Sequence, residues 1–319
     1  MPIPPTLRQT LHDIHGPAAL TWLDGLPSLL VACGQRWRLT VEPPFAPLSY
    51  AYVAPAVRDD GSHVVIKAAP PGRGLAAERA ALQAFGGRGA VELLASDEAH
   101  GVLLLRRVLP GTSLTEWVDA GRDDDATRAA AEVMRGLCRP PVAAAFAWPT
   151  VADRARGLDR LRARFDGGTG PLPAGLVGRA EATFAELIAG SAPAALLHGD
   201  LHHGNILRSS AGTQAKENDA SPSGWLAIDP QGVLGEPAYE VGALLRNPLP
   251  WLLSGGQRRA RQISARRIAI LSESLALDRE RLAAWGAAQA VLSAWWSVED
   301  HGWGWEGAIE VADALFDLR

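Results

Sequence analysis

The chain has 319 residues, of which 47% are hydrophobic and 21% charged, and 31 basic against 35 acidic residues give a net charge of −4. This composition is typical of a globular protein with room for two lobes, and the negative balance argues against nucleic acid or an anionic membrane as partners. No window approaches 18 uncharged apolar residues, and the N-terminus lacks the pattern of a secretory signal, so neither is expected. Cys33 and Cys138 form no metal-binding spacing and are expected to be reduced thiols in a cytoplasmic protein.

The first part of the chain combines helical and extended patterns. Residues 6–34 are typical of helix, with a break at Gly16-Pro17, where proline suits the first turn of a second helix. Asp59-Asp60-Gly61 is a strong hairpin signal between two extended runs. The segments expected after the leading helices are strands at 37–41, 48–57 and 62–68, a helix at 76–85, and strands at 91–95 and 101–108.

From residue 109 onward the patterns are mainly helical. LPGTSL at 109–114 is typical of a hinge, and the extended segments at 205–208 and 225–228 predict a short hairpin whose polar loop spans 209–224. The C-terminal helices are rich in tryptophan, and Trp295 and Trp296 are expected to pack in the core. The chain is therefore predicted to be an α+β protein of two lobes, a small strand-rich lobe at 1–108 and a larger helical lobe at 109–319.

Two polar motifs in the second half indicate chemistry: HGDLHHGN at 198–205 and AIDPQG at 227–232. Asp200 can orient an attacking hydroxyl and accept its proton, while Asn205 and Asp229 can hold Mg²⁺ against a polyphosphate, which is what phosphoryl transfer from a nucleotide needs. Each residue is also common as a helix or turn cap, but capping does not explain the ordered set. Because Asp229 precedes Pro230, its backbone is expected to be extended.

Three histidines accompany the first motif. The imidazole of His198 is expected to bridge backbone groups of the two motifs. A zinc site made of His198, His202 and His203 is disfavoured, because no cysteine or fourth ligand lies at a plausible spacing. For His202 and His203 two roles stay open, contact with substrate or phosphate and simple packing of the loop.

A lysine in the small lobe supplies a second element of a nucleotide site. Alternation in HVVIK predicts Val64 and Ile66 on one face and Val65 and Lys67 on the other. Lys67 could reach nucleotide phosphates, with Glu78 on the following helix pairing with its ammonium. The alternatives are an edge-strand lysine and a solvated helix carboxylate, but the pair together favours a nucleotide site.

Nucleotide contacts beyond this pair are expected from the backbone. The segment 50–61 should close over the nucleotide although it lacks GxGxxG, because the amides of a tight turn can also cradle phosphate. The hinge backbone from Arg107 to Leu109 is expected to present an amide and a carbonyl to an adenine edge.

These motifs carry a family resemblance. HGDLHHGNIL with AIDPQGVLGEPAYEVG resembles the aminoglycoside phosphotransferases, and PLSYAYVAPAVRDDGSHVVIK, AAERAAL, LLLRRVLPGTSL and ALLRNP more narrowly resemble their streptomycin 6-phosphotransferase and hydroxyurea phosphotransferase branch. The resemblance covers nearly the whole chain. It implies a two-lobed protein-kinase-like fold and ATP-dependent transfer of the γ-phosphoryl group to a hydroxyl of a small molecule, with Mg²⁺.

The resemblance also implies residue roles, which agree with the interpretation above. Asp200 would be the catalytic base, Asn205 and Asp229 the Mg²⁺ ligands, Lys67 the phosphate ligand and Glu78 its partner. His203 stands where related loops often have proline.

The sequence disfavours two other classes of protein. A protein kinase would need an activation segment of roughly 20–30 residues after the metal-binding aspartate, whereas only residues 233–238 separate Gly232 from Tyr239. A nucleotide-binding regulator without transfer activity would be expected to have lost Asp200, Asn205, Asp229 or Lys67, and all four are present. The expected partner is thus a small-molecule acceptor, and the expected assembly a monomer or weak homodimer.

The acceptor is expected to be an aminoglycoside such as streptomycin, with hydroxyurea or an endogenous sugar or other metabolite as alternatives. A cationic aminocyclitol requires carboxylates near the reaction centre. The candidates are Glu236, Glu299 and Asp300, with His202 as a further substrate contact, although a solvated helix end explains Glu299 and Asp300 equally well. Glu240 is expected to cap the helix that follows Pro237.

Overall fold

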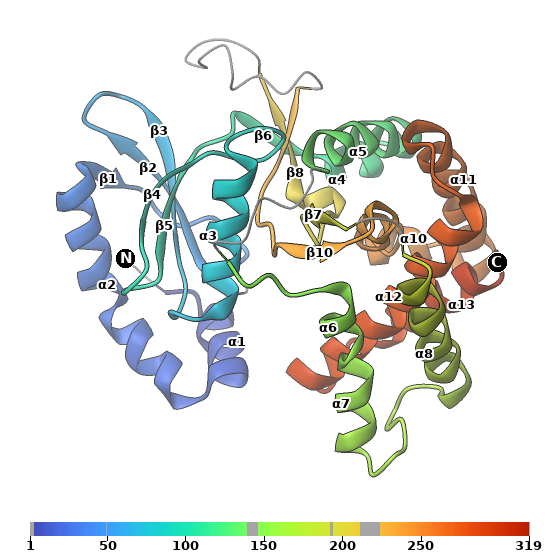
Figure 1. Ribbon diagram of the computed structural model, residues 1–319. Helices are drawn as coiled ribbons and strands as arrows, with labels where there is room; N and C mark the ends of the chain where they lie inside the picture. The colour runs from blue at the N-terminus through green and yellow to red at the C-terminus, as the bar shows by residue number, and fades with distance from the viewer. Residues whose placement is uncertain (1–2, 49, 139–145, 192–193, 211–223, 319) are drawn as a thin grey trace. The chain divides into compact units, whose positions relative to one another are not determined.

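Two compact units make up the chain, Met1–Leu109 and Pro110–Arg319. The computed structural model describes residues 3–48, 50–138, 146–191, 194–210 and 224–318 (Figure 1). The boundary between the units follows Leu109, whereas the sequence places the end of the first lobe at residue 108. Each unit has its own secondary structure and core.

In the described residues, the first unit is an antiparallel sheet with strand order β1-β2-β3-β5-β4 together with three helices (Figure 1). Its elements are α1 (Pro5–His15), α2 (Pro17–Trp37), β1 (Leu39–Val41), β2 (Tyr52–Arg58), β3 (His63–Ala68), α3 (Arg73–Phe85), β4 (Leu93–Asp97) and β5 (Val102–Arg106). The order is the expected one, but Trp37 ends α2 instead of beginning a strand. The reason lies in Arg38, whose φ of 57° and N–H bond to the Gly34 carbonyl close the helix one turn later.

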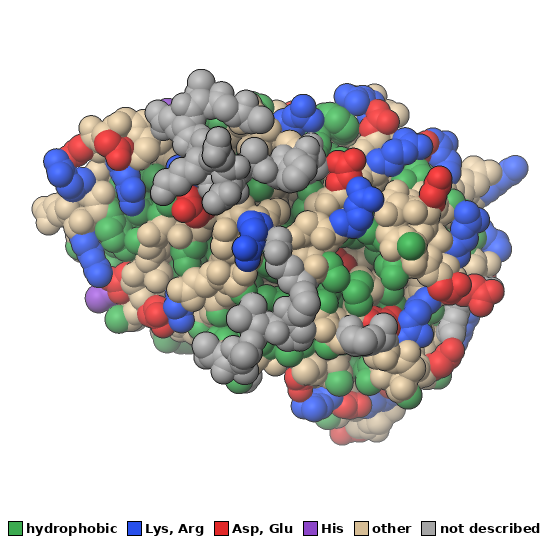
Figure 2. Space-filling model, turned by 45° about the horizontal axis from the view of Figure 1, so that its top comes forward, with side chains coloured by type: hydrophobic (Ala, Val, Ile, Leu, Met, Phe, Trp, Pro, Cys, Tyr) green, Lys and Arg blue, Asp and Glu red, His purple; other side chains and the backbone are tan. Residues whose placement is uncertain are grey.

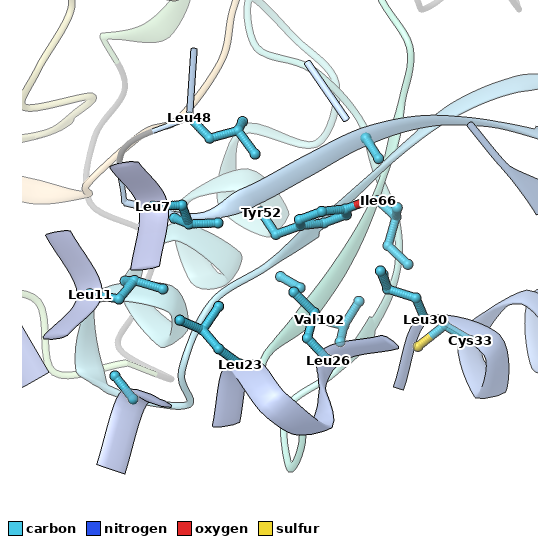
Figure 3. Packing of buried hydrophobic residues seen from close by; sticks show 13 residues of the cluster. Leu7, Leu11, Leu23, Leu26, Leu30, Cys33, Leu48, Tyr52, Ile66 and Val102 are labelled. Atoms are coloured by element: carbon cyan, nitrogen blue, oxygen red, sulfur yellow. The ribbon is translucent and has the colours of Figure 1, made fainter. Parts of the chain in front are cut away.

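Alternation along the strands separates two faces of this sheet. Residues of one parity, such as Tyr52, Ile66 and Val102, pack against leucines of α1 and α2 in a fully buried cluster (Figure 3). Lys67 has the opposite parity and therefore points to the other face. Val64 and Ile66 are both buried, as the alternation of HVVIK predicts.

Among its described residues, the second unit is mainly helical and contains five short strands. Its helices are α4 (Leu114–Asp119), α5 (Asp123–Leu137), α6 (Val151–Ala155), α7 (Gly157–Arg164), α8 (Ala174–Ala189), α9 (Val241–Leu245), α10 (Leu249–Leu253), α11 (Gly256–Leu275), α12 (Arg279–Asp300) and α13 (Glu306–Phe316), with 3₁₀ turns η1 (His203–Asn205) and η2 (Pro237–Glu240). Its strands are β6 (Pro110–Ser113), β7 (Ala195–Leu197), β8 (Ile206–Ser209), β9 (Trp225–Ala227) and β10 (Val233–Gly235).

The short strands form two small antiparallel sheets, β6-β8-β9 and β10-β7. The expected hairpin is confirmed, since β8 pairs with β9 in a register that sets Ile206 opposite Ala227. Residues 211–223 of its expected loop lie outside the described residues. The expected hinge segment also contributes a strand, because β6 pairs with β8.

Helix α12 is the central helix of this unit, with most of its residues buried against α7, α8, α9 and α13. Trp285 and Trp295 are fully buried, so the core-packing expectation is confirmed for Trp295, while Trp296 is half-buried. Trp303, in the loop after α12, is 72% exposed.

No helix in the described parts of the chain is long and apolar enough to cross a membrane. On the face shown in Figure 2, basic and acidic side chains are interspersed and do not gather into a patch of one sign.

A buried ion pair ties α11 to the start of α5. Arg267 is 0% exposed and its Nη2 lies 2.6 Å from Oδ1 of Asp123, while its Nη1 donates to the carbonyls of Leu244 and Asn247. A buried charge of this kind is tolerated only while every partner is present.

Asp123→Asn is expected to lower the free energy of unfolding by about 3–5 kcal/mol, because it leaves the Arg267 charge buried without its counter-ion. Asp125→Asn, in the same first turn of α5 but in an exposed pair with Arg122, is the matched control and should cost at most about 1 kcal/mol. Urea unfolding followed by circular dichroism measures both. Equal losses for the two variants would contradict the assigned role of the Arg267–Asp123 pair.

Candidate active site

Lys67 and Glu78 form a buried ion pair in the first unit. Lys67 Nζ lies 2.7 Å from Glu78 Oε1, and each side chain is 10% exposed. Lys67 is on β3, between Val53 of β2 and Leu103 of β5, and Glu78 is in the middle of α3. The carboxylate therefore holds the ammonium at a defined place on the sheet. The edge-strand alternative is wrong, because β3 is an inner strand.

The hinge residues differ in what their backbone can offer. The Arg107 amide donates to the His63 carbonyl at 3.2 Å, and its guanidinium lies 3.6 Å from Glu42 and over the ring of Phe45. That amide is thus engaged by the sheet, which corrects the expectation for the amide of Arg107, whereas a contact of its carbonyl with an adenine stays a prediction. Leu109 is 42% exposed at the end of the unit, and its backbone contact with an adenine stays a prediction.

In the second unit the two polar motifs connect short strands and are tied to each other. The first lies between β7 and β8, and the second between β9 and β10. The Ile228 amide donates to the Asn205 carbonyl at 2.9 Å, and the Gln231 amide donates to the His198 carbonyl at 2.8 Å. Segments about 30 residues apart are thereby held side by side.

His198 completes this connection through its ring, as the sequence predicts. Nε2 donates to the Ile228 carbonyl at 2.7 Å, and Nδ1 accepts the Asp200 amide at 3.3 Å. This pattern requires a neutral imidazole protonated at Nε2. Complete burial lowers the pKa of His198 to about 4, which keeps it neutral. Both ring nitrogens are committed to backbone groups, so neither can bind zinc.

The side chain of Glu240 binds the backbone of the first motif. Its two carboxylate oxygens accept the backbone N–H groups of His198 and Gly199 at 2.7 and 2.9 Å. The expectation that Glu240 caps the following helix is wrong, since its side chain makes no capping bond at the start of α9. The carboxylate instead fixes the backbone immediately before Asp200.

Asp200 receives two side-chain donors. Arg246 Nη2 lies 2.9 Å from Oδ1, and Gln231 Nε2 lies 3.3 Å from Oδ2. Burial by itself raises the pKa of Asp200, but the cations around it, Arg246 foremost, outweigh burial and lower it. Asp200 is therefore ionised, and each oxygen keeps a lone pair able to accept a further proton or hydrogen bond.

Asn205 and Asp229 carry the kind of oxygen donors that a hard divalent cation prefers. Asn205 Nδ2 donates to the Asp200 carbonyl at 3.0 Å, which turns the amide so that Oδ1 remains for a cation. Mg²⁺ is commonly held by one or two such oxygens together with substrate phosphates. Asp229 has a φ of 59°, in the left-handed region, so the extended backbone expected before Pro230 is wrong. Such strain in a non-glycine residue is typical of functional sites.

The two remaining histidines pack the loop. His202 Nδ1 accepts the Gly204 amide at 3.1 Å, so its ring caps the turn η1. His203 is fully buried, and within the described residues neither of its ring nitrogens has a hydrogen-bond partner. The packing alternative is thus the one observed for His203, and substrate contact stays a prediction for His202.

Two of the three carboxylates expected to bind a cationic acceptor have other partners. Glu236 is 2% exposed, accepts from Arg281 Nε and Nη2 at 2.6 Å each, and also accepts from the Trp285 indole. Its role is to join η2 to α12, which corrects the expectation of a substrate ligand. Both oxygens of Glu299 accept from Arg160 at 2.8 Å. Asp300, half-buried with its pKa raised by burial, stays a candidate.

The sequence did not point to Arg246, Gln231 or Glu240 as partners of the Asp200 loop. Arg246 and Gln231 lie 46 and 31 residues after Asp200, and no local periodicity relates positions so far apart. Arg246 and Gln231 do lie within ALLRNP and AIDPQG, two of the segments that carry the family resemblance.

The pKa of Glu240 yields a prediction about stability. Burial raises this pKa to about 7, and the hydrogen bonds from Gly199 and His198 offset only part of that rise. The pKa of Glu240 in the folded protein lies above its ordinary value of 4.5. The stability that protonated Glu240 contributes is therefore complete below pH 4.5 and is lost as the pH rises through 7.

Glu240→Gln replaces one carboxyl oxygen by an NH₂ group, so one of the two buried backbone amides loses its acceptor. This should lower the free energy of unfolding by about 1–3 kcal/mol near pH 5. Glutamine does not titrate, so the difference from the wild-type protein should narrow between about pH 5 and pH 8. Urea unfolding at both pH values measures it. A difference that widens as the pH rises would contradict the assignment.

Comparison with known proteins agrees with the geometry. A family model described as "Aminoglycoside/hydroxyurea antibiotic resistance kinase" matches residues 36–301. Hydroxyurea phosphotransferase of Kitasatospora aureofaciens is 34% identical, with 93% of this chain and 81% of that protein covered. Streptomycin 6-kinase of Streptomyces griseus is 30% identical, with 93% and 91% covered.

Among solved structures, a choline/ethanolamine kinase family protein from Mesorhizobium loti superposes with a TM-score of 0.60 at 16% identity, covering 93% of this chain and 94% of that one. At this identity the likeness concerns the fold alone. The expected two-lobed protein-kinase-like fold is confirmed.

Proposed function

This chain belongs to the aminoglycoside/hydroxyurea antibiotic resistance kinase family, and we propose that it transfers the γ-phosphoryl group of ATP, with Mg²⁺, to a hydroxyl of an aminoglycoside such as streptomycin. It is a small-molecule kinase that uses an alcohol group as acceptor. The observation that carries the proposal is the joined pair of motifs that brings Asp200, Asn205 and the Asp229 segment together. An enzyme that consumes ATP is expected to work in the cytoplasm.

Asp200 is proposed as the group that orients the acceptor hydroxyl and receives its proton. Its carboxylate is ionised and its direction is set by Arg246 and Gln231. Asn205 and Asp229 would hold Mg²⁺, which neutralises charge on the phosphates when it is bound. His198 and Glu240 take no direct part in this scheme and keep the two motifs in place.

Lys67 is proposed as the ligand of the nucleotide phosphates, with Glu78 restraining its ammonium. The pair is buried and its separation of 2.7 Å is that of a charge-assisted hydrogen bond. An ammonium held in this way loses little conformational entropy when it meets a phosphate.

Hydroxyurea is the second candidate acceptor. One observation favours it: two of the three carboxylates expected to receive a cationic acceptor, Glu236 and Glu299, are neutralised by Arg281 and Arg160. A small neutral acceptor needs no such counter-charge. The relatives named above include a protein of each kind.

The acceptor is tested by ADP release from the purified protein with Mg-ATP and streptomycin, other aminoglycosides, hydroxyurea or simple sugars. Streptomycin should stimulate ADP release. If the pairing of Glu236 and Glu299 with arginines excludes a cationic acceptor, hydroxyurea should stimulate ADP release instead. No stimulation by any compound in this panel would refute the proposed resistance activity.

Asp200→Asn should lower the rate of transfer by about a thousandfold, because it removes the proton acceptor. Binding of ATP, measured by calorimetry, should stay close to that of the wild-type protein. Loss of both transfer and binding in a folded variant would show that Asp200 does not have the proposed role.

Lys67→Ala should raise the KM for ATP at least about tenfold, because a charge-assisted contact with the phosphates is lost. Glu78→Gln should act in the same direction but less strongly, since it loosens the lysine without removing it. Arg79→Ala is the control on the same helix, where Arg79 pairs with the exposed Glu98. Unchanged kinetics in Lys67→Ala would refute the nucleotide role of the pair.

A further inference from the structure

Arg246 is a buried cation in direct contact with the proposed catalytic base. We propose that Arg246 is a positioning residue that holds the Asp200 carboxylate in the orientation needed to receive the acceptor hydroxyl, and that Arg267 and Asp123 fix the backbone that carries it. This inference rests on the proposed role of Asp200. It adds to the site a chain of contacts that begins two helices away.

The contact between Arg246 and Asp200 has the geometry of a fixed pair. Their side chains are 10% and 24% exposed, and Nη2 lies 2.9 Å from Oδ1. Gln231 Nε2, at 3.3 Å from Oδ2, restrains the second oxygen. A carboxylate held at both oxygens cannot rotate freely. The directions of the lone pairs left for a hydroxyl are therefore fixed.

The backbone on both sides of Arg246 is held in place by Arg267. Arg267 Nη1 donates to the Leu244 carbonyl at 2.9 Å and to the Asn247 carbonyl at 2.6 Å. These carbonyls come two residues before and one residue after Arg246. The same guanidinium uses Nε and Nη2 for Asp123, at 3.0 and 2.6 Å from Oδ1.

The arrangement therefore runs from α5 through α11 to the end of α9 and then to Asp200. Each contact is charge-assisted, and Arg267 is completely buried. Such a chain supports a reacting group in the way that outer ligands support a metal site, by limiting the positions open to it. Its loss should affect the rate of the chemical step more than the binding of either substrate.

The experiment measures kcat and the KM for ATP in Arg246→Ala and Arg246→Lys, with streptomycin, with hydroxyurea, and with water as acceptor in slow Mg-ATP hydrolysis. Arg246→Ala should lower kcat about a hundredfold while the KM for ATP changes less than about threefold. Arg246→Lys should fall between Arg246→Ala and the wild-type protein. Guanidinium ion added at millimolar concentration should restore at least about tenfold of the loss in Arg246→Ala.

Two matched controls accompany these variants. Arg162→Ala removes an arginine that pairs with both oxygens of Glu181 at 2.8 Å elsewhere in the same unit, and it should neither lower kcat nor respond to guanidinium. Asp123→Asn, assayed below its unfolding transition, should lower kcat about tenfold at unchanged KM, whereas Asp125→Asn should not.

The outcomes separate this inference from the proposed function. If Asp200→Asn keeps wild-type hydrolysis, the proposed role of Asp200 fails and the inference fails with it. If Asp200→Asn is inactive while folded Arg246→Ala keeps its kcat, raises KM instead, or gains nothing from guanidinium, the inference alone is overturned. Should Arg246→Ala not fold, the kcat of Arg246→Lys decides, because a wild-type value there contradicts the need for a guanidinium fork.

Discussion

The carboxylate of Glu240 accepts two consecutive backbone N–H groups, those of His198 and Gly199, in a fully buried position. The direction of the chain leading into Asp200 depends on this contact. Because the amides would otherwise be buried without acceptors, the cost of losing it is that of unsatisfied donors in a low-dielectric interior. His198 then transmits the placement to the second motif through the Ile228 carbonyl. The Glu240 carboxylate thus sets the positions of both polar motifs.

Arginines of the second unit provide the counter-charge of three other carboxylates. Arg246 faces Asp200, Arg267 faces Asp123 and Arg281 faces Glu236, and each pair includes a side chain that is at most 10% exposed. Guanidinium suits this use because its planar donors can bind a carboxylate and backbone carbonyls at once. In these three pairs the second unit keeps ionised groups inside, each with a partner of opposite sign. Such an interior resists local rearrangement, which a phosphoryl-transfer site requires.

Much of the fold followed from periodicity and turn chemistry. The two leading helices broken at Gly16, the hairpin at Asp59-Asp60-Gly61 and the β8–β9 hairpin are local features, and local patterns report them. The Lys67–Glu78 pair was also predictable, because a strand and the next helix leave few partners for a lysine directed away from the core. Backbone conformation at Asp229 was not, since tertiary contacts override the usual preference of a residue before proline.

The sequence by itself determined which groups we propose for the chemistry: Asp200, Asn205 and Asp229 stand in an order and spacing that few other functions use. Only the tertiary structure decided which charged residues contact those groups and which pair elsewhere in the fold. Glu236, a candidate for the acceptor, is occupied by Arg281, whereas Arg246, an unremarked arginine, contacts Asp200. The physical reason is that a charge acts according to what lies within a few ångströms of it, and the residues that meet here are separated by about 45 positions of the chain.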